Sequence, residues 1–250
     1  MPVFTGVGVA IVTLFDDVGE LDAAATGRLA EQLVEAGVRA VVVAGTTGEA
    51  FALERAERVE LLSAVRKSLD GAVPLIAGTG APSARAAAAL TRDAVDHGAD
   101  AVLTLSPAGA SDVRPYYAEV AAAAGTTPVL AYHYPAVSAP GIPVDVLPDL
   151  PVAGVKDSTG DPDRLLQTLD AFAGDLYTGS SWVLSYAGSL GCAGAILALA
   201  NAEPERCIAA FFGDIDAQRA LTPGNVALRA GRLKETVAER FGTATTRRID

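Results

Sequence analysis

Short apolar runs alternate along the chain with longer segments in which apolar residues recur every three or four positions. Short runs bounded by turn residues are typical of buried strands, and the longer periodic segments are typical of helices. The pattern predicts strands at Gly8–Thr13, Ala40–Ala44, Pro74–Ala77, Ala101–Leu105, Pro128–Tyr132, Val152–Lys156, Leu176–Thr178 and Cys192–Leu197. It predicts helices at Leu21–Ala36, Leu53–Leu69, Ser83–His97, Pro115–Ala124, Val144–Leu150, Pro162–Phe172, Trp182–Ser189 and, as one further helix, Thr222–Arg240.

Strands that alternate with helices in this way indicate parallel βαβ units. Eight such units in 250 residues predict an α/β fold of the (β/α)8 TIM-barrel type. A weak internal repeat supports this: Ala36–Val41 resembles His97–Val102, and each looks like a helix end, a glycine and a strand start. We expect residues 1–205 to form the barrel and residues 206–250 a C-terminal helical extension of the same domain.

Composition excludes some classes of function. A net charge of -11 argues against a nucleic-acid-binding or anionic-membrane surface. The N-terminus lacks a secretory signal pattern, and no apolar run reaches membrane-spanning length, so a cytoplasmic location is expected. The two cysteines, Cys192 and Cys207, are too few for a disulfide framework, and Cys192 is expected to be a buried free thiol. Two distant histidines give no metal-ligand spacing, so neither a metal nor another cofactor is expected.

One lysine stands in an unusual sequence environment. Of the three lysines, Lys67 and Lys234 lie in charged, helix-like segments, where solvated amines are expected. Lys156 instead ends the apolar run Pro151–Val155, and a lysine at the end of a buried strand is costly unless it is paired or used. Burial lowers the pKa of such an amine, and a neutral amine attacks a ketone to form a Schiff base. Local sequence leaves two interpretations open, an ion pair or a catalytic role.

Polar residues also follow other predicted strands, where the chemistry of such barrels is located. The loop Gly45–Glu49, Gly-Thr-Thr-Gly-Glu, is compatible with anion binding and equally with an ordinary glycine-rich turn. Tyr132 and His133 end the fifth strand, and only one of them points into the barrel because side chains alternate. A phenol there can transfer protons or be a half-buried structural aromatic. The segment Thr178–Trp182 either lines a pocket or caps a helix.

Taken together, Gly45–Glu49, Tyr132–Ala136 and Gly154–Ser158 resemble the dihydrodipicolinate synthase / N-acetylneuraminate lyase family in order and spacing, over roughly Val3 to Asn201. The resemblance implies a (β/α)8 barrel, a homo-oligomer (dimer or tetramer), and a metal-free class I aldolase reaction between pyruvate and an aldehyde.

The resemblance also implies roles for individual residues. Lys156 matches the Schiff-base lysine, and Tyr132 matches the tyrosine that relays protons. Thr46 is expected to bind the keto-acid carboxylate, and Thr47 to move protons with Tyr132 as well as contact the substrate. Gly48 is expected to contribute to the same binding loop. Ile196 matches the position whose backbone carbonyl lines the site.

Three features depart from the family pattern. Val137 stands where synthases carry an arginine that holds the second substrate's carboxylate. The stretch Ser106–Ala110 lacks the further tyrosine that members carry there, and Tyr116 and Tyr117 are expected on the next helix. The region after Asn201 is shorter than usual, so the expected helical extension is a shortened one.

The leading hypothesis is a Schiff-base lyase or aldolase that acts on pyruvate and a 4-hydroxy-2-oxo acid or 2-keto-3-deoxy sugar acid. One alternative is 4-hydroxy-tetrahydrodipicolinate synthase, which joins pyruvate and aspartate semialdehyde. A second alternative, from another class, is a non-catalytic keto-acid-binding protein, because fold alone does not guarantee activity.

Overall fold

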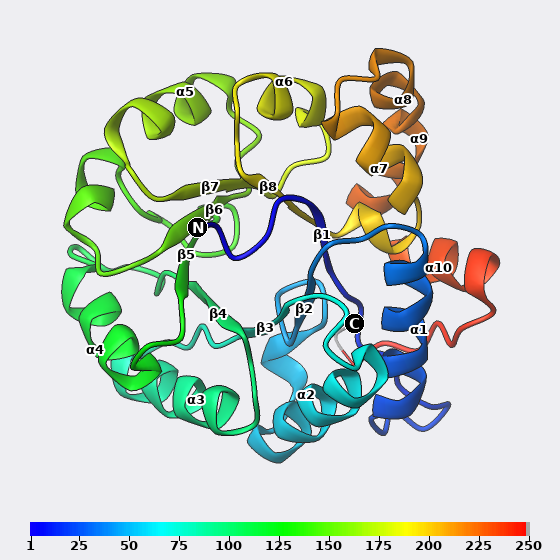
Figure 1. Cartoon of the computed structure of the whole chain (residues 1–250). Helices are drawn as coiled ribbons and strands as arrows, with labels where there is room; N and C mark the ends of the chain where they lie inside the picture. The colour runs from blue at the N-terminus through cyan, green and yellow to red at the C-terminus, as the bar shows by residue number, and fades with distance from the viewer. Residues whose placement is uncertain (249–250) are drawn as a thin grey trace.

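The apolar runs form eight parallel strands that close into a barrel in the order of the chain (Figure 1). The computed structural model describes residues 1–248. The predicted fold class is confirmed, and each predicted strand overlaps an observed one. The strands are β1 (Gly6–Ala10), β2 (Val41–Val43), β3 (Leu75–Gly78), β4 (Ala101–Leu105), β5 (Val129–His133), β6 (Gly154–Asp157), β7 (Asp175–Thr178) and β8 (Gly194–Leu197).

Helices surround the barrel, because their apolar stripes pack on the outer faces of the strands (Figure 1). They are α1 (Ala23–Glu35), α2 (Arg55–Leu69), α3 (Ala84–Asp96), α4 (Arg114–Ala124), α5 (Pro162–Ala171), α6 (Leu184–Ser189), α7 (Pro204–Phe211), α8 (Ile215–Ala220), α9 (Thr222–Arg229) and α10 (Leu233–Phe241), with 3₁₀ turns η1 (Ala50–Ala52), η2 (Val144–Asp149) and η3 (Leu199–Asn201).

The internal repeat corresponds to two equivalent helix ends. Gly37 and Gly98 have φ angles of +100° and +84°, which glycine adopts without steric cost. After each glycine the next backbone N–H reaches back to a helix carbonyl, Val38 to Leu33 and Ala99 to Ala94. This is the glycine-terminated helix end that the repeat predicted.

Two sequence predictions about helices were wrong, and two helices had no prediction. The segment Val144–Leu150 forms the 3₁₀ turn η2 rather than an α-helix, because Pro148 lacks the N–H that an α-helix needs. The single helix expected at Thr222–Arg240 is two helices, α9 and α10, separated at Gly231, whose φ is +75°. Helices α7 and α8 were not predicted.

The interior divides into two apolar clusters. A small one fills the barrel and includes Phe4, Ile76, Tyr177 and Ile196. A larger one lies between the strands and the surrounding helices. Cys192 and Cys207 are both buried free thiols, as expected for Cys192. Because side chains fill the inside of the barrel, a ligand binds at an end of the barrel and not within it.

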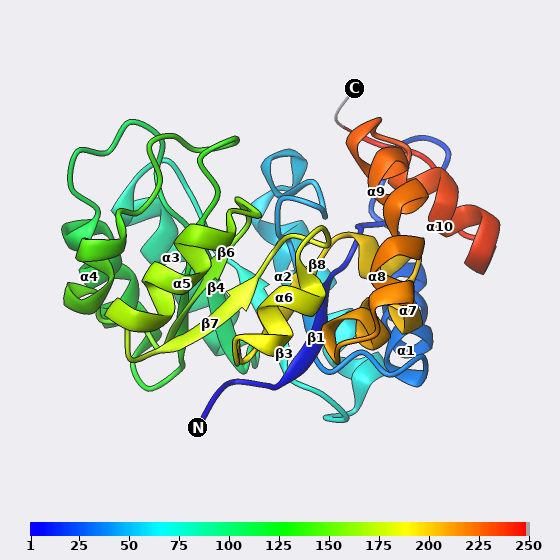
Figure 2. The same ribbon diagram turned by 90° about the horizontal axis from the view of Figure 1, so that it is seen from above.

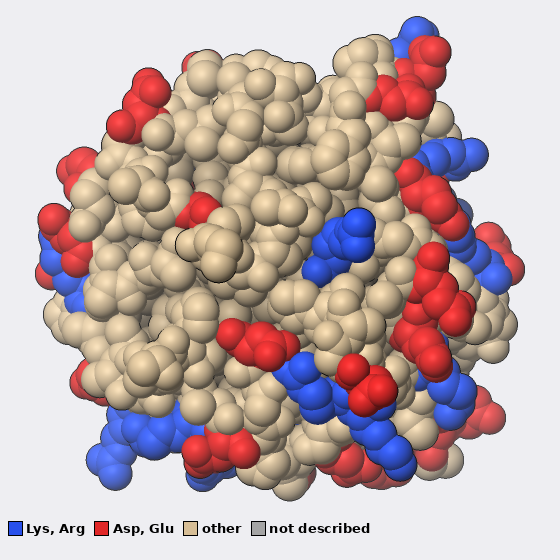
Figure 3. All heavy atoms as spheres, in the orientation of Figure 1, with Lys and Arg blue, Asp and Glu red and all other residues tan. Residues whose placement is uncertain are grey.

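Helices α9 and α10 lie at the end of the barrel where the strands terminate (Figure 2). The opposite face, at the start of the strands, carries basic side chains interspersed with acidic ones (Figure 3). Within residues 1–248, none of the helices has the length and apolarity needed to cross a membrane.

Candidate active site

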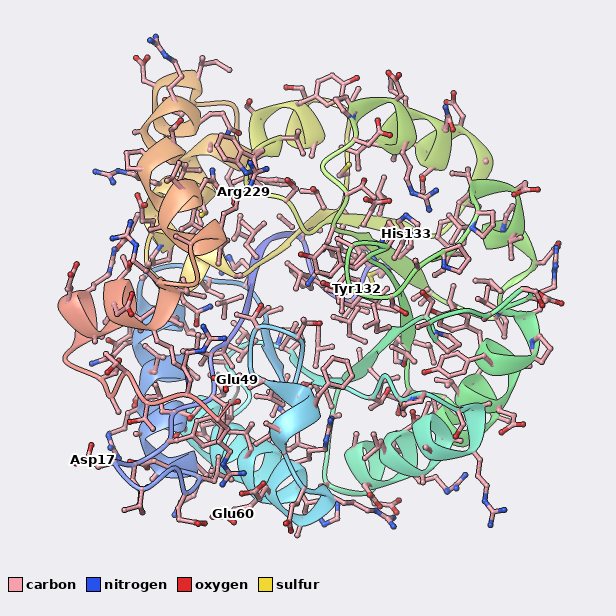
Figure 4. All side chains as sticks on the ribbon, turned by 180° about the vertical axis from the view of Figure 1, so that it is seen from behind. Asp17, Glu49, Glu60, Tyr132, His133 and Arg229 are labelled. Carbon is pink, nitrogen blue, oxygen red and sulfur yellow. The ribbon has the colours of Figure 1, made fainter. Side chains whose placement is uncertain are left out.

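A cavity of about 600 Å³ opens where the strands end. Its wall combines residues that follow β2, β5, β6, β7 and β8 with residues of the C-terminal helices and tail. Seen onto this end, Tyr132 lies near the middle of the barrel, and Glu49 and Arg229 lie toward the side of α9 and α10 (Figure 4). The lining residues are Val12, Thr46, Thr47, Glu49, Tyr132, Tyr134, Lys156, Ser158, Thr159, Gly160, Gly179, Ser180, Ser181, Trp182, Ala198, Asn225, Leu228, Arg229, Gly231, Leu233, Lys234 and Arg247.

Lys156 and Tyr132 are neighbours in this cavity because β5 and β6 pair with these two residues in register. The Lys156 side chain is buried, and its Nζ lies 4.2 Å from the centre of the Tyr132 ring. Within residues 1–248 no carboxylate forms an ion pair with Lys156. Burial therefore acts unopposed and lowers the pKa of Lys156 to about 7. The ion-pair interpretation of this lysine is not supported, and at neutral pH much of the amine is uncharged.

Space for the Lys156 side chain is provided by a glycine on the next strand. A methyl group at Gly179 would lie 2.8 Å from Cε of Lys156 and would also collide with Ser158. Gly179 follows β7, which pairs with β6. Glycine at this position lets the amine extend along the strand ends into the cavity, so the segment Thr178–Trp182 contributes to the pocket.

The Tyr132 hydroxyl is held by two other hydroxyl groups. Ser158 donates a hydrogen bond to it at 3.3 Å, and Thr46 also hydrogen-bonds to it. Burial raises the pKa of Tyr132 to about 12, although these two hydrogen bonds act in the opposite direction. The phenol is therefore protonated at neutral pH and able to donate or relay a proton.

The Gly-Thr-Thr-Gly-Glu loop is a tight turn between two residues with unusual backbone geometry. Ala44 and Glu49 have φ angles of +50° and +56°, which cost about 1–3 kcal/mol each for residues other than glycine. Inside the turn the Gly48 N–H donates to the Gly45 carbonyl at 3.1 Å. Thr46 and Thr47 line the cavity. Backbone strain of this kind persists only where the surrounding structure stabilises it. Here the strained turn directs the hydroxyl groups of Thr46 and Thr47 to the cavity.

Two of the predicted site residues do not line the cavity. A methyl group at Gly48 would lie 2.9 Å from the Ile11 carbonyl, and Thr13 donates to the Gly48 carbonyl at 2.7 Å. Gly48 thus lets the loop approach β1 closely. Ile196 is fully buried in the apolar cluster inside the barrel, and Ala198 provides the β8-side lining. The expected contact of the Ile196 carbonyl with substrate stays a prediction.

The expectation that Lys234 is solvated was wrong. The Lys234 side chain is 6% exposed, and its Nζ lies 2.8 Å from a carboxylate oxygen of Glu49. It also donates to the Thr246 carbonyl at 2.7 Å and lies 4.5 Å from the centre of the Phe15 ring. Burial lowers the pKa of Lys234, and the Glu49 carboxylate opposes this effect. Lys234 lies in the first turn of α10, and its pairing depends on tertiary packing that a helical pattern does not reveal.

His133 points away from the cavity (Figure 4), and neither His133 nor Asp157 lines it, as strand alternation predicted. Asp157 is buried and forms an ion pair with Arg164 at 2.5 Å. His133 Nδ1 accepts a hydrogen bond from the Ile142 N–H at 2.8 Å, and burial together with Arg164 lowers the pKa of His133 to about 4. These residues stabilise the ends of β5 and β6 from outside.

The loop after β4 lacks a tyrosine at the cavity, as expected. Tyr116 and Tyr117 lie on α4, and their hydroxyls donate to backbone carbonyls, Tyr116 to Ala81 and Tyr117 to Thr104. Val137 is 44% exposed and does not line the cavity. The loop after β4 therefore supplies no tyrosine to the cavity, and the position of Val137 supplies no arginine.

Sequence reasoning missed the contribution of the C-terminal region to the cavity. The residues involved are Asn225, Leu228, Arg229, Gly231, Leu233, Lys234 and Arg247. Their segment has an ordinary amphipathic pattern, so no local signal marks them. The family resemblance gives Ser158 no role, although the sequence carries a signal for one: Ser158 follows Lys156 by two residues, so alternation directs both side chains to the same side.

A metal centre finds no support in the part of the chain that the structure describes. Among residues 1–248 there is no group of three or more histidine, cysteine, aspartate or glutamate side chains suitable for holding a metal ion. The polar groups that meet in the cavity are instead an amine, hydroxyls and basic side chains.

Comparison with known proteins agrees with this geometry. A sequence model described as the Dihydrodipicolinate synthetase family matches residues 3–227. An uncharacterized DapA-like lyase of Halobacterium salinarum is 37% identical over 227 residues, which cover 86% of this chain and 74% of that protein. A 4-hydroxy-tetrahydrodipicolinate synthase of Pseudomonas aeruginosa is 34% identical, over 85% of this chain and 77% of that protein.

Solved structures show the same similarity. A 4-hydroxy-tetrahydrodipicolinate synthase of Methylacidiphilum fumariolicum superimposes with a TM-score of 0.91 at 25% identity, over 98% of this chain and 89% of that one. A chloride-inhibited dihydrodipicolinate synthase of Acinetobacter baumannii, complexed with pyruvate, gives a TM-score of 0.81 at 30% identity, over 90% of this chain and 84% of that one.

Proposed function

This chain belongs to the dihydrodipicolinate synthetase family and is a carbon–carbon lyase of the class I aldolase type, and from that premise we propose that it joins pyruvate to an aldehyde, or cleaves the product, through a Schiff base on Lys156. The observation that carries the proposal is the buried amine of Lys156, which has no ion-pair partner among the described residues and lies 4.2 Å from the ring centre of Tyr132.

The reaction follows from a neutral amine in this position. Nζ of Lys156 attacks the keto carbon of pyruvate, and loss of water leaves a protonated imine. The imine withdraws electrons, so the adjacent methyl group loses a proton and becomes an enamine. The enamine carbon attacks the aldehyde carbon and forms the new carbon–carbon bond. Hydrolysis then releases a 4-hydroxy-2-oxo acid and restores the amine.

Proton transfer is assigned to a row of hydroxyl groups. Tyr132 stands at its centre and contacts Thr46 and Ser158. The family pattern suggested Thr47 for the relay and Thr46 for the keto-acid carboxylate. The contacts of Tyr132 favour the opposite assignment, in which Thr46 takes part in the relay and Thr47 orients the carboxylate.

Ser158 takes the place of the absent loop tyrosine in this proposal. The loop after β4 brings no phenol to the cavity, whereas the Ser158 hydroxyl lies 3.3 Å from that of Tyr132. A serine hydroxyl both donates and accepts, so it can pass a proton between Tyr132 and the substrate or solvent.

A trapping experiment tests the proposal. The protein is incubated with pyruvate, reduced with borohydride, digested and mapped by mass spectrometry. We expect a reduced pyruvyl adduct on Lys156 and none on Lys67, which is exposed and serves as the matched lysine. Absence of an adduct on Lys156 would overturn the proposal.

Turnover separates the catalytic proposal from non-catalytic keto-acid binding. Both predict the adduct, but only an aldolase releases a 4-hydroxy-2-oxo acid when an aldehyde is added. The protonated phenol of Tyr132 beside Lys156 supports the catalytic alternative.

Oligomeric state and cytoplasmic location stay predictions. A similar solved structure is described as the first monomeric dihydrodipicolinate synthase variant, with a TM-score of 0.88 at 25% identity.

A further inference from the structure

The charge of the cavity contrasts with the charge of the chain. The whole chain has a net charge of -11. The charged side chains that line the cavity are Lys156, Arg229, Lys234, Arg247 and one acid, Glu49. Because Glu49 and Lys234 pair, two arginines supply positive charge beyond the Schiff-base lysine. Pyruvate brings one carboxylate, so positive charge remains for a second anionic group.

Arg229 is an exposed residue at the end of α9 that stacks on Trp182. Its guanidinium carbon lies 4.7 Å from the centre of the Trp182 ring, and both side chains line the cavity. One turn earlier on the same helix, Asn225 accepts a hydrogen bond from the buried Ser181 hydroxyl. Within residues 1–248 no carboxylate forms an ion pair with Arg229. A guanidinium stacked on an indole keeps its N–H edge available for an anion.

Arg247 reaches the cavity from the C-terminal tail. Its guanidinium donates to the Gly231 carbonyl at 3.2 Å, which within residues 1–248 is its one hydrogen-bond partner. The next residue anchors this segment, because the Arg248 N–H donates to Glu49 at 2.8 Å and its guanidinium pairs with Glu57 at 2.6 Å. The tail therefore holds Arg247 beside the α9–α10 turn.

We propose that Arg229 and Arg247 form the subsite for a distal anionic group on the second substrate, so that the aldehyde partner is a carboxylated or phosphorylated aldehyde. The inference rests on the proposed function. Planar guanidinium groups bind carboxylate and phosphate through paired hydrogen bonds. The subsite lies on the C-terminal helices and tail, whereas Val137 on the β5 side offers no charge.

Kinetics with matched aldehydes test the subsite. Glyceraldehyde is compared with glyceraldehyde 3-phosphate, and butanal with succinic semialdehyde, so that each pair differs in the anionic group. We expect the anionic member to have the lower KM. Arg229→Gln should raise that KM about tenfold or more, with a smaller change in kcat. Arg247→Gln should act in the same direction, and Arg232→Gln, an exposed arginine outside the cavity lining, should leave KM unchanged.

The two pairs also identify the anion. A preference confined to succinic semialdehyde assigns the subsite to a carboxylate, and one confined to glyceraldehyde 3-phosphate assigns it to a phosphate. Preference for the neutral aldehydes, or an equal change in KM for neutral and anionic members in Arg229→Gln, would overturn the inference.

A binding measurement decides the inference without turnover. Succinate, with butane-1,4-diol as the neutral match, is titrated by calorimetry into protein that carries the reduced pyruvyl adduct. We expect succinate alone to bind, and its Kd to rise about tenfold in Arg229→Gln. Unchanged binding in this variant overturns the inference while the adduct upholds the proposed function. Failure to form the adduct overturns the proposed function, and succinate binding to unmodified protein then still tests the arginines.

Discussion

Lys156 at the end of β6 and Lys234 at the start of α10 are both buried, both line the cavity and both lie over an aromatic ring. They differ in their partners. Lys234 pairs with Glu49 at 2.8 Å, whereas Lys156 forms no ion pair within residues 1–248. Burial lowers the pKa of both, but only at Lys234 does a carboxylate oppose the shift. Burial alone therefore does not mark a reactive lysine, and the missing counter-charge does.

The largest effect is expected from removing the unpaired amine. Lys156→Met should reduce aldol turnover by at least about 10³-fold and abolish the borohydride adduct, because the nucleophile is lost. Turnover with pyruvate and each aldehyde measures the first effect, and mass spectrometry the second. Lys67→Met is the matched control and should keep both. Retained turnover in Lys156→Met would place the chemistry elsewhere.

Removing the paired amine should mainly reduce stability. Lys234→Met removes the buried cation that pairs with the Glu49 carboxylate, and the free energy of unfolding should fall by about 3–5 kcal/mol. Urea denaturation measures this change. Adding Glu49→Gln to Lys234→Met should recover part of the loss, since the buried charge is then removed. A change within about 0.5 kcal/mol would mean that the pair contributes no more than an exposed one.

The same substitution at Lys156 should have the opposite sign. The folded pKa is about 7 against an ordinary 10.5, so the folded state binds fewer protons than the unfolded state between these values. Stability of the wild type therefore rises with pH across this window. Lys156→Met should be more stable by about 1–3 kcal/mol at pH 7 and below, and its advantage should vanish above about pH 10.5. A pH series of urea melts measures it, and destabilisation at pH 7 would contradict it.

The pH dependence of trapping sharpens the comparison further. Only the neutral amine attacks pyruvate, so the initial rate of adduct formation should rise about tenfold from about pH 6 to about pH 8 and then level off. Rates are measured by quenched borohydride trapping. If the rate of adduct formation kept rising beyond about pH 9, the pKa of Lys156 would be closer to that of a lysine paired with a carboxylate, and the expected lowering would be wrong.

The smallest effect concerns the proton relay. Ser158→Ala removes one hydroxyl from Tyr132 and leaves the contact with Thr46. We expect kcat to fall about threefold to tenfold, with little change in adduct formation, because the amine is untouched. Ser180→Ala, a neighbouring hydroxyl that lines the same cavity, is the control and should change kcat less. Equal effects would remove Ser158 from the relay.

Some parts of the site were predictable because they depend on local periodicity. A strand directs alternate side chains to opposite sides, so Tyr132 could be separated from His133 and Lys156 from Asp157 before the fold was known. The parallel barrel then brings the ends of β5 and β6 together, and these residues meet in register. The assignment of roles to Thr46 and Thr47 depends on the contact between Thr46 and Tyr132. Both threonines lie in a loop, where strand alternation does not predict side-chain direction.

Other parts depended on contacts between distant segments. Lys234 looked solvated because its helix carries charged residues, yet packing of α10 against the loop after β2 buries it. Arg229 reaches the cavity only because α9 ends beside the β7–α6 loop. Helices α7 and α8 were missed although local signals existed: Pro204 begins α7, and Asp214 caps the start of α8.

The sequence by itself determined the order of the eight strands, the barrel class and the placement of Lys156 and Tyr132 at strand ends, because hydrophobic periods of 2 and 3.6 residues are local properties. Tertiary structure decided which buried lysine receives a carboxylate partner and which arginines reach the cavity. Those outcomes rest on contacts such as that of Arg248 with Glu49, 199 residues apart, and no local pattern specifies which distant charge will arrive.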